Sequence, residues 1–355
     1  MKRTFLFLTV TIAMVMGVKA QQQTATLQRG NSTTYYFGED AFKEAYNAAN
    51  DEAIITLSAG YFNTVDSITK QITIRGNGYT GNKTVIGKTI NDGVPLSLII
   101  HANNVRLEGL STESTIYVSD TKNLYINRSY VESFCAVNGE IHSIVPYHAN
   151  TIIDQCWVDF IWSKNDDNFC IKNSFIIDYG TSSITVNNNN QFFNCVVGKF
   201  EPKVSYRNCI INVQTNEGTV SFRDDKEYYN NVFICGLKVK SQNYHDVSGY
   251  YASVISIDES TRYSTPTLPD IETSNIKGNS VALFDDIFNY TNEENPLYAP
   301  IITIITGDDG TMVGPYGGTG FSENPSIPRI TESKIDTYTD GEGKLNVKVK
   351  VEVGQ

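Results

Sequence analysis

Residues 192–213 contain one short pattern twice, and this repeat constrains the fold more than any other feature of the chain. The segment FFNCVV, which starts at Phe192, returns as YRNCII from Tyr206, 14 positions later. In each copy an aromatic residue stands two positions before an asparagine, and a cysteine and two aliphatic residues follow it. Repeats of roughly 20 residues with variable spacing are typical of solenoids, in which each copy forms one rung.

The pattern extends over seven copies when the asparagine is taken as an anchor. The anchors are Gly109, Arg128, Gln155, Asn173, Asn194, Asn208 and Asn231. One position later stand mostly small residues, namely Leu110, Ser129, Cys156, Ser174, Cys195, Cys209 and Val232. Three positions after the anchor stand Thr112, Val131, Val158, Ile176, Val197, Ile211 and Ile234. Because side chains alternate across a strand, these two columns share a face, which we expect to be buried.

The anchors are predicted to lie where the chain bends. Stacked asparagines at a bend can bond one another's amides and the neighbouring backbone, which would form an asparagine ladder. The cysteines at 156, 195 and 209 are expected inside the coil as small core residues. A disulfide between Cys195 and Cys209 stays open as an alternative, because a rung spacing of ~4.8 Å is compatible with the Cα separation of a disulfide.

The first twenty residues have the pattern of a secretory signal. Lys2 and Arg3 precede an apolar run, and small residues end at Ala20. This run is shorter than the ~20 apolar residues that a membrane span needs, and no other stretch qualifies. We therefore expect a chain without a membrane span that is secreted, either to the extracellular space or to the periplasm or cell surface.

Three further segments follow residues 1–20. Residues 21–52 include an amphipathic helix with Phe42, Ala45, Tyr46 and Ala49 on one face, which would cap the open end of a coil. Residues 53–325 are predicted to form the coil. Residues 326–355 alternate strictly after an Asp340–Gly341 turn, which predicts a hairpin or edge strand packed on the last rungs.

Composition supports strands and limits the partners. Asparagine, threonine, serine, isoleucine, valine and tyrosine are frequent, which favours strands and turns over helices. The formal charge is −11, and removal of the three basic residues in the signal would make it −14. Such a surface repels phosphate backbones, so no nucleic-acid partner is expected.

With these features taken together, the chain resembles secreted bacterial right-handed parallel β-helix proteins of the pectate-lyase-like superfamily. The resemblance rests on the early helix, on IITLSAGYF, on the repeated rungs, and on GDDGTMVGPYGGTGF from Gly307, which is similar to a closing rung. It implies an all-β fold: a right-handed parallel β-helix (solenoid) with an N-terminal capping helix and a C-terminal β-hairpin tail. Fold alone does not assign an activity.

No catalytic set can be named from the sequence. Enzymes of this superfamily use clustered acids with a basic residue or calcium, so calcium is expected only if the chain is an enzyme. The acidic pairs Asp166–Asp167 and Asp224–Asp225 fall on rungs three apart. The rung spacing sets them about 14 Å from each other, which is too far for them to act as acid and base on the same bond. No metal ligands are assigned, because the four histidines show no paired spacing.

The position two after the anchor supplies the candidate ligand-binding residues. It should point outward, and it holds Ser111, Tyr130, Trp157, Phe175, Val196, Ile210 and Phe233. A row of outward aromatic rings can stack on sugar rings, so Tyr130, Trp157, Phe175 and Phe233 are predicted to bind ligand. The alternative is that a loop, the C-terminal hairpin or the insertion at residues 241–280 covers the row.

Three functions follow as hypotheses. The leading one is a secreted β-helix that contacts an extracellular polysaccharide or a cell-surface partner without a recognisable catalytic site. The second is a polysaccharide lyase or glycoside hydrolase whose acids meet only in three dimensions. The third is a structural or adhesin spacer.

Overall fold

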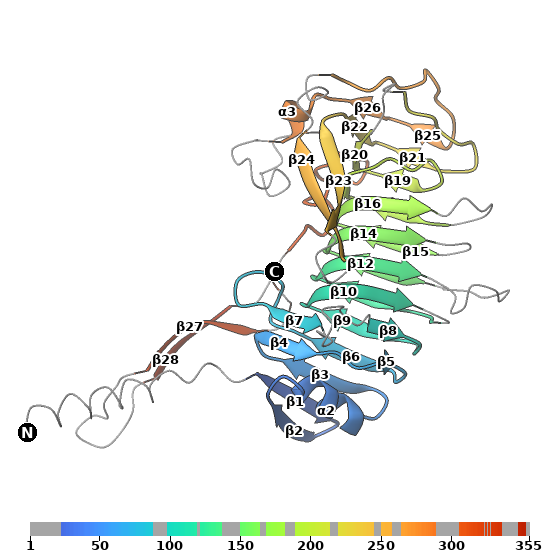
Figure 1. Cartoon of the computed structure of the whole chain (residues 1–355). Coiled ribbons are helices and arrows are strands. Elements are labelled where there is room, and N and C mark those ends of the chain that lie inside the picture. The colour runs from blue at the N-terminus through green and yellow to red at the C-terminus, as the bar shows by residue number, and fades with distance from the viewer. Residues whose placement is uncertain are drawn as a thin grey trace, which may run out of the picture.

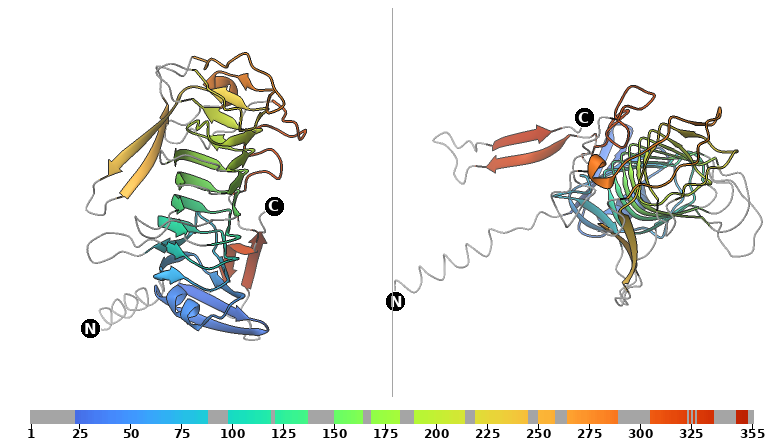
Figure 2. Two further views of the ribbon diagram at one scale, coloured as in Figure 1. Left: turned by 90° about the vertical axis from the view of Figure 1, so that its right-hand side faces the viewer. Right: turned by 90° about the horizontal axis from the view of Figure 1, so that it is seen from above.

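A computed structural model describes residues 23–87, 98–118, 121–136, 150–163, 168–181, 189–213, 219–244, 250–257, 264–288, 305–322, 324, 326, 328–335 and 347–352. Within these ranges the chain is all-β, with two long sheets of stacked parallel strands (Figure 1). Seen along the stack, successive rungs overlie one another (Figure 2). This architecture is consistent with a β-helix-like solenoid.

The first sheet, sheet A, has 12 strands among the described residues. Its order is β2 (Ser32–Phe37), β1 (Thr24–Arg29), β3 (Ala53–Leu57), β6 (Ile72–Arg75), β9 (Arg106–Glu108), β11 (Tyr125–Asn127), β13 (Thr151–Asp154), β15 (Phe169–Lys172), β17 (Gln191–Phe193), β19 (Ser205–Arg207), β21 (Tyr228–Tyr229) and β25 (Ile276–Lys277). The strand β1 pairs antiparallel with both β2 and β3, and from β3 onward the pairs are parallel.

The second sheet, sheet B, also has 12 strands in the described part of the chain. Its order is β26 (Ser280–Val281), β22 (Val232–Ile234), β20 (Ile210–Asn212), β18 (Val196–Val197), β16 (Phe175–Thr181), β14 (Trp157–Ser163), β12 (Tyr130–Ala136), β10 (Ser111–Val118), β7 (Thr84–Gly87) and β4 (Gly60–Asn63), with β8 (Leu98–Ile100) on β10 and β5 (Ser67–Ile68) on β8. All these pairs are parallel.

A single residue in the left-handed backbone conformation joins sheet A to sheet B on eight of the rungs. These corner residues are Gly109, Arg128, Gln155, Asn173, Asn194, Asn208, Asn230 and Gly278, with φ between 47° and 67°. Six of the seven predicted anchors are therefore corners. Asparagine is among the residues that tolerate this conformation best, which explains its recurrence at the bend.

The last anchor was wrong by one residue. Asn230 forms the corner, and Asn231 takes the small interior slot, fully buried. There its amide accepts a hydrogen bond from the Cys209 backbone N–H and donates one to the Tyr206 carbonyl. Because the two asparagines are adjacent, the sequence pattern fits either one as the anchor. With the anchor at Asn230 instead of Asn231, Phe233 moves from the outer face to the interior.

The predicted interior columns are confirmed on the other rungs. Cys156, Cys195 and Cys209 are fully buried in the main core. They are free thiols, so the alternative of a disulfide between Cys195 and Cys209 is not realised. The asparagine ladder occurs at a different corner, before sheet A, where Asn123 donates to Asn104 at 2.9 Å and accepts from Asn150 at 3.5 Å.

The predicted helix is α2 (Ala41–Ala48), which packs on β1, β2, β3 and β4. Its expected apolar face is buried, with Phe42 and Ala45 at 0% exposure. A second short helix, α3 (Phe284–Ile287), follows the last rung. No helix in the described ranges is long and apolar enough to cross a membrane.

Two antiparallel hairpins extend beyond the stacked rungs. The pair β23 (Leu237–Tyr244) and β24 (Tyr250–Ile257) comes from the insertion, and β24 lies against β14 and β16 (Figure 1). The pair β27 (Arg329–Ile335) and β28 (Val347–Glu352) confirms the expected C-terminal hairpin. Figures 1 and 2 place that hairpin at the level of the first rungs and pointing away from them, so its expected packing on the last rungs is wrong.

Residues 305–322, 324 and 326, here called the strap, do not close the coil with another rung. Their backbone is held by corner side chains of successively earlier rungs, from Asn208 through Asn173 and Gln155 to Arg128. The strap therefore runs back along the corners, against the direction in which the rungs accumulate. The glycine-rich sequence that resembled a closing rung instead permits close contact with the corners.

Candidate functional site

The predicted outward column is present and in direct register. Tyr130 lies opposite Trp157, Trp157 opposite Phe175, and Phe175 opposite Val196 on neighbouring parallel strands. The rings of Trp157 and Phe175 stack with centroids 5.3 Å apart and an interplanar angle of 25°. Three of the four predicted ligand-binding residues thus share one outer surface, whereas Phe233 lies in the interior.

This row is covered rather than open. Trp157 is 7% exposed and Phe175 is 1% exposed. In the strap, the rings of Tyr316 and Phe321 meet Phe175 edge-on at 6.2 and 4.9 Å. Further along, α3 and residues next to it pack on the same surface and form a second core outside the coil. Its buried members include Val196, Ile210, Val232, Phe284, Ile287, Phe288 and Val313.

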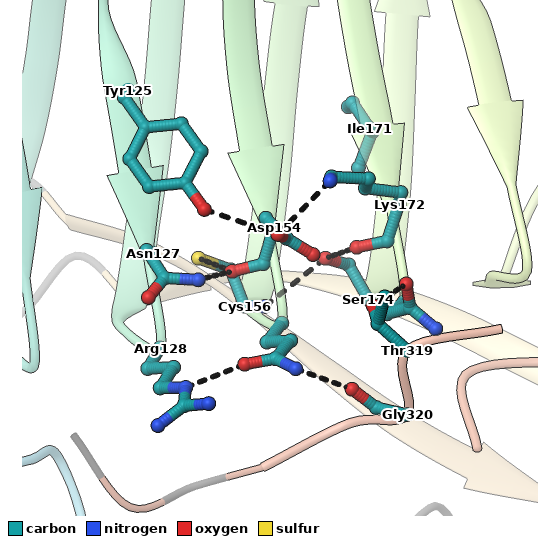
Figure 3. Close-up of polar contacts among 12 residues, drawn as sticks. Tyr125, Asn127, Arg128, Asp154, Cys156, Ile171, Lys172, Ser174, Thr319 and Gly320 are labelled. Carbon is teal, nitrogen blue, oxygen red and sulfur yellow. Dashed lines mark hydrogen bonds and ion pairs between the residues drawn. The ribbon is translucent and has the colours of Figure 1, made fainter. Parts of the chain in front are cut away.

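The cover is bonded to the corners as well as packed on the aromatic rings. Asn173 Nδ2 donates to the Pro315 carbonyl at 3.2 Å. Gln155 Nε2 donates to the carbonyl of Gly320 at 2.5 Å, the bond drawn to Gly320 in Figure 3. Arg128 Nε donates to Gln155 Oε1 at 2.5 Å, which orders that amide. Of the alternatives for the aromatic row, a covered surface is the one that the structure shows for Trp157 and Phe175.

An acidic site remains at the first part of the row, around Asp159. The Tyr130 hydroxyl donates to Asp159 Oδ2 at 2.5 Å, and Trp157 Nε1 donates to Asp159 Oδ1 at 2.7 Å. Asp159 is 6% exposed, while Tyr130 is half-buried. Two predicted site residues therefore meet at a carboxylate that the sequence analysis did not single out.

Asp159 lies on the outer face at the start of a bend in sheet B. Its side chain shares that face with Trp157, two residues earlier, by ordinary alternation along the strand. Val158 and Ile161 both point into the main core, so two residues rather than one lie between inward positions at the bend. The available signal was the spacing in the segment WVDFI, since residues i and i+2 of a strand share a face.

Burial changes the acidity of Asp159. Loss of hydration raises its pKa to about 6, although the hydrogen bonds from Tyr130 and Trp157 lower it. The rise outweighs the lowering because the free energy of removing the charged carboxylate from water is larger than the stabilisation that the two hydrogen bonds give it. A carboxyl group with such a pKa can exchange a proton near neutral pH.

Two more acidic residues lie on the neighbouring strands. The register of β12 and β14 sets Glu132 beside Asp159, because Val131 pairs with Val158 and Ser133 with Phe160. On the other side, in β16, Asp178 lies opposite Phe160, one residue after Asp159, and its Oδ1 lies 3.6 Å from Lys199 Nζ. Carboxyl groups on adjacent rungs with a nearby lysine thus line the bend of sheet B.

A separate polar cluster lies on the outer face of sheet A (Figure 3). Asp154 Oδ2 accepts from the Tyr125 hydroxyl at 3.1 Å and lies 3.3 Å from Lys172 Nζ. Burial and the adjacent Asp154 charge raise the pKa of Tyr125 well above its usual value. The Arg106 guanidinium lies over the Tyr125 ring at 4.8 Å. We interpret this cluster as an ion-pair network between rungs, because each charge faces an opposite charge.

The acidic pairs noted in the sequence do not build a site in the described residues. Asp225 is bonded to Arg223 in an exposed turn. Asp166 and Asp167 lie outside the described residues. No group of three histidine, cysteine, aspartate or glutamate residues in the described ranges is arranged to hold a metal ion.

The fold and the site define an all-β protein of long parallel sheets whose outer aromatic row is covered by its own C-terminal strap and ends at a buried carboxylate. Comparisons with protein-family models, with curated proteins and with solved structures found no match.

Proposed function

We propose that this chain is a secreted right-handed parallel β-helix protein of the pectate-lyase-like superfamily that contacts an extracellular polysaccharide or a cell-surface glycan. In this proposal residues 1–20 direct export, and α2 caps the coil. The contact surface is the Asp159 site with the half-buried ring of Tyr130, next to Trp157, which is 7% exposed. It is smaller than the predicted row, because Phe175 and Phe233 are buried.

The observation that carries the proposal is the pairing of aromatic rings with a carboxylate on an outer face. A phenol ring offers an apolar face to the C–H groups of a sugar, and a carboxylate accepts hydrogen bonds from its hydroxyl groups. The donors from Tyr130 and Trp157 fix the orientation of the Asp159 oxygens. Such fixed polar groups beside aromatic surface are what a specific ligand site needs.

Binding to a glycan array tests this proposal. We expect Tyr130→Ala and Asp159→Asn each to weaken binding by ~10-fold or more, because each removes a hydrogen bond to a charged group. Tyr117→Ala is the matched control, since Tyr117 is a partly exposed tyrosine of β10 outside this site. Unchanged binding by both site variants would refute the site, and no binding by the wild-type protein would refute the function.

A second candidate, glycoside hydrolysis or polysaccharide elimination, is favoured by the pKa of about 6 at Asp159. Strands ~4.8 Å apart bring Glu132 close enough to act as the second carboxyl group of an acid–base pair. Release of reducing ends or unsaturated products from a polysaccharide panel, lost in Glu132→Gln and Asp159→Asn, would support it. Dependence on added calcium would point to elimination, for which calcium is the expected cofactor.

A further inference from the structure

The strand β2 (Ser32–Phe37) forms the free end of sheet A among the described residues. One side of the strand pairs with β1. Its sequence, STTYYF, contains no charged residue, no glycine and no proline. A free edge of this length and composition is a ready template for another strand.

The hairpin geometry shows which backbone groups face outward. Arg29 and Ser32 flank a two-residue turn and are paired, so they form a hydrogen-bonded pair of the ladder. Bonding alternates along an antiparallel strand, and the N–H and C=O groups of Thr33, Tyr35 and Phe37 therefore face the free edge.

The same alternate residues carry the largest exposed aromatic surface of the described chain. Tyr35 is 60% exposed and Phe37 is 57% exposed. Their neighbours Thr34 and Tyr36 face the core together with the buried Ala25 and Leu27 of β1. The strand thus offers both unpaired backbone groups and apolar side chains along one line.

Charge protects other edges of this protein but not this one. The strand β28 has exposed Lys348 and Lys350, which discourage pairing with another chain. The chain as a whole carries −11, so most of its surface repels a second copy. The neutral strand β2 lacks that repulsion.

Charges at the two ends of β2 select one orientation. Exposed Glu39 and Asp40 follow the strand, whereas exposed Arg29 lies beside its first residue, Ser32. A parallel second strand would bring acidic residues together. An antiparallel one sets the acidic end of each copy near Arg29 of the other.

We propose that a second copy of this chain pairs antiparallel with β2 and joins two molecules end to end through a continuous sheet. Opposite residues of an antiparallel pair point to the same face, so a twofold axis at Tyr35 keeps the two outer faces together. Tyr35 then lies opposite Tyr35 of the second copy, and Thr33 lies opposite its Phe37. The aromatic pair at Tyr35 and the two Thr33–Phe37 pairs, each of an aromatic with a β-branched residue, add stabilisation beyond the backbone bonds.

Light scattering coupled to size-exclusion chromatography, together with sedimentation equilibrium, tests the proposal on the purified chain. The wild-type protein is expected to have about twice the mass of one chain. Tyr35→Lys places two ammonium groups opposite each other and should raise the dimer dissociation constant at least ~10-fold. Ile271→Lys, at a residue 47% exposed and far from β2 in the sequence, is the control and should remain dimeric.

A charge reversal tests the orientation. Arg29→Glu should weaken the dimer, and Glu39→Arg added to it should restore the wild-type dissociation constant. Circular dichroism verifies that each variant is folded. A wild-type monomer overturns the proposal, including one whose β2 edge is occupied by its own residues 1–22. A dimer indifferent to Tyr35→Lys, or a reversal that gives no rescue, also overturns it.

Discussion

The buried carboxyl of Asp159 gives the sharpest test of the site, because its burial makes stability depend on pH in a specified direction. Its pKa in the folded protein is about 6, against 3.8 for an unperturbed aspartate. The folded state therefore binds the proton more tightly than the unfolded state. Stability contributed by this group is fully present below pH 3.8 and is lost as pH rises through about 6.

The size of the effect follows from the same shift. Each pKa unit corresponds to ~1.4 kcal/mol, so ionising Asp159 in the folded protein costs about 3 kcal/mol relative to the unfolded chain. The variant Asp159→Asn has no such ionisation. The difference in unfolding free energy between variant and wild type should therefore move by about 3 kcal/mol in favour of the variant between about pH 3 and pH 7.

Urea unfolding of both proteins, followed by circular dichroism across this pH range, measures the difference. The matched control is Asp225→Asn, because the exposed Arg223 partner lowers the pKa of Asp225 instead of raising it. The control should show a small change, and in the opposite direction. A wild-type-minus-variant difference that is constant with pH, or that follows the control, would refute the burial argument.

Three further outcomes are expected. Gly317→Ala should destabilise the protein by ~2 kcal/mol or more in thermal unfolding, because a Cβ there would lie 1.8 Å from the Met312 carbonyl oxygen and 2.6 Å from an Asn194 amide. Native labelling with a thiol reagent should modify the partly exposed Cys170 before the three fully buried cysteines, whose reaction should await unfolding. Arg207→Ala should change the free energy of unfolding by at most ~1 kcal/mol in urea titration, since its ion pair with Asp308 is solvent-exposed.

The sequence predicted the stacked parallel strands, the interior cysteines and six corner positions, because the strand, the small interior slot and the corner recur from copy to copy. At a repeated position, the residue types of seven copies together indicate whether that position is buried, exposed or at a bend. Asn230 and Asn231 show the limit of this logic, since the two residues are identical and only the register of β20 with β22 shows which one is the corner. A one-residue shift then exchanges inside and outside, which is why Phe233 was misplaced.

The candidate site was only partly predictable for a different reason. Tyr130 and Trp157 were found because they belong to a repeated column. Alternation along β14 sets Asp159 on the same face as Trp157, but Asp159 occurs once and outside the repeated columns, so no other copy of the repeat pointed to it. The cover over Phe175 comes from Tyr316 and Phe321, more than 140 residues away, for example between Asn173 and Gly317 at a separation of 144.

The strap also has a consequence for how the chain folds. Ser326 bonds Glu108 across a sequence separation of 218 residues, one of the longest connections in the described fold. Contacts between such distant positions form late, because the chain loses much entropy when it closes so large a loop. Until the strap docks, the rings of Trp157 and Phe175 are exposed to water. A chain truncated before residue 305 would therefore keep this apolar surface exposed and tend to aggregate.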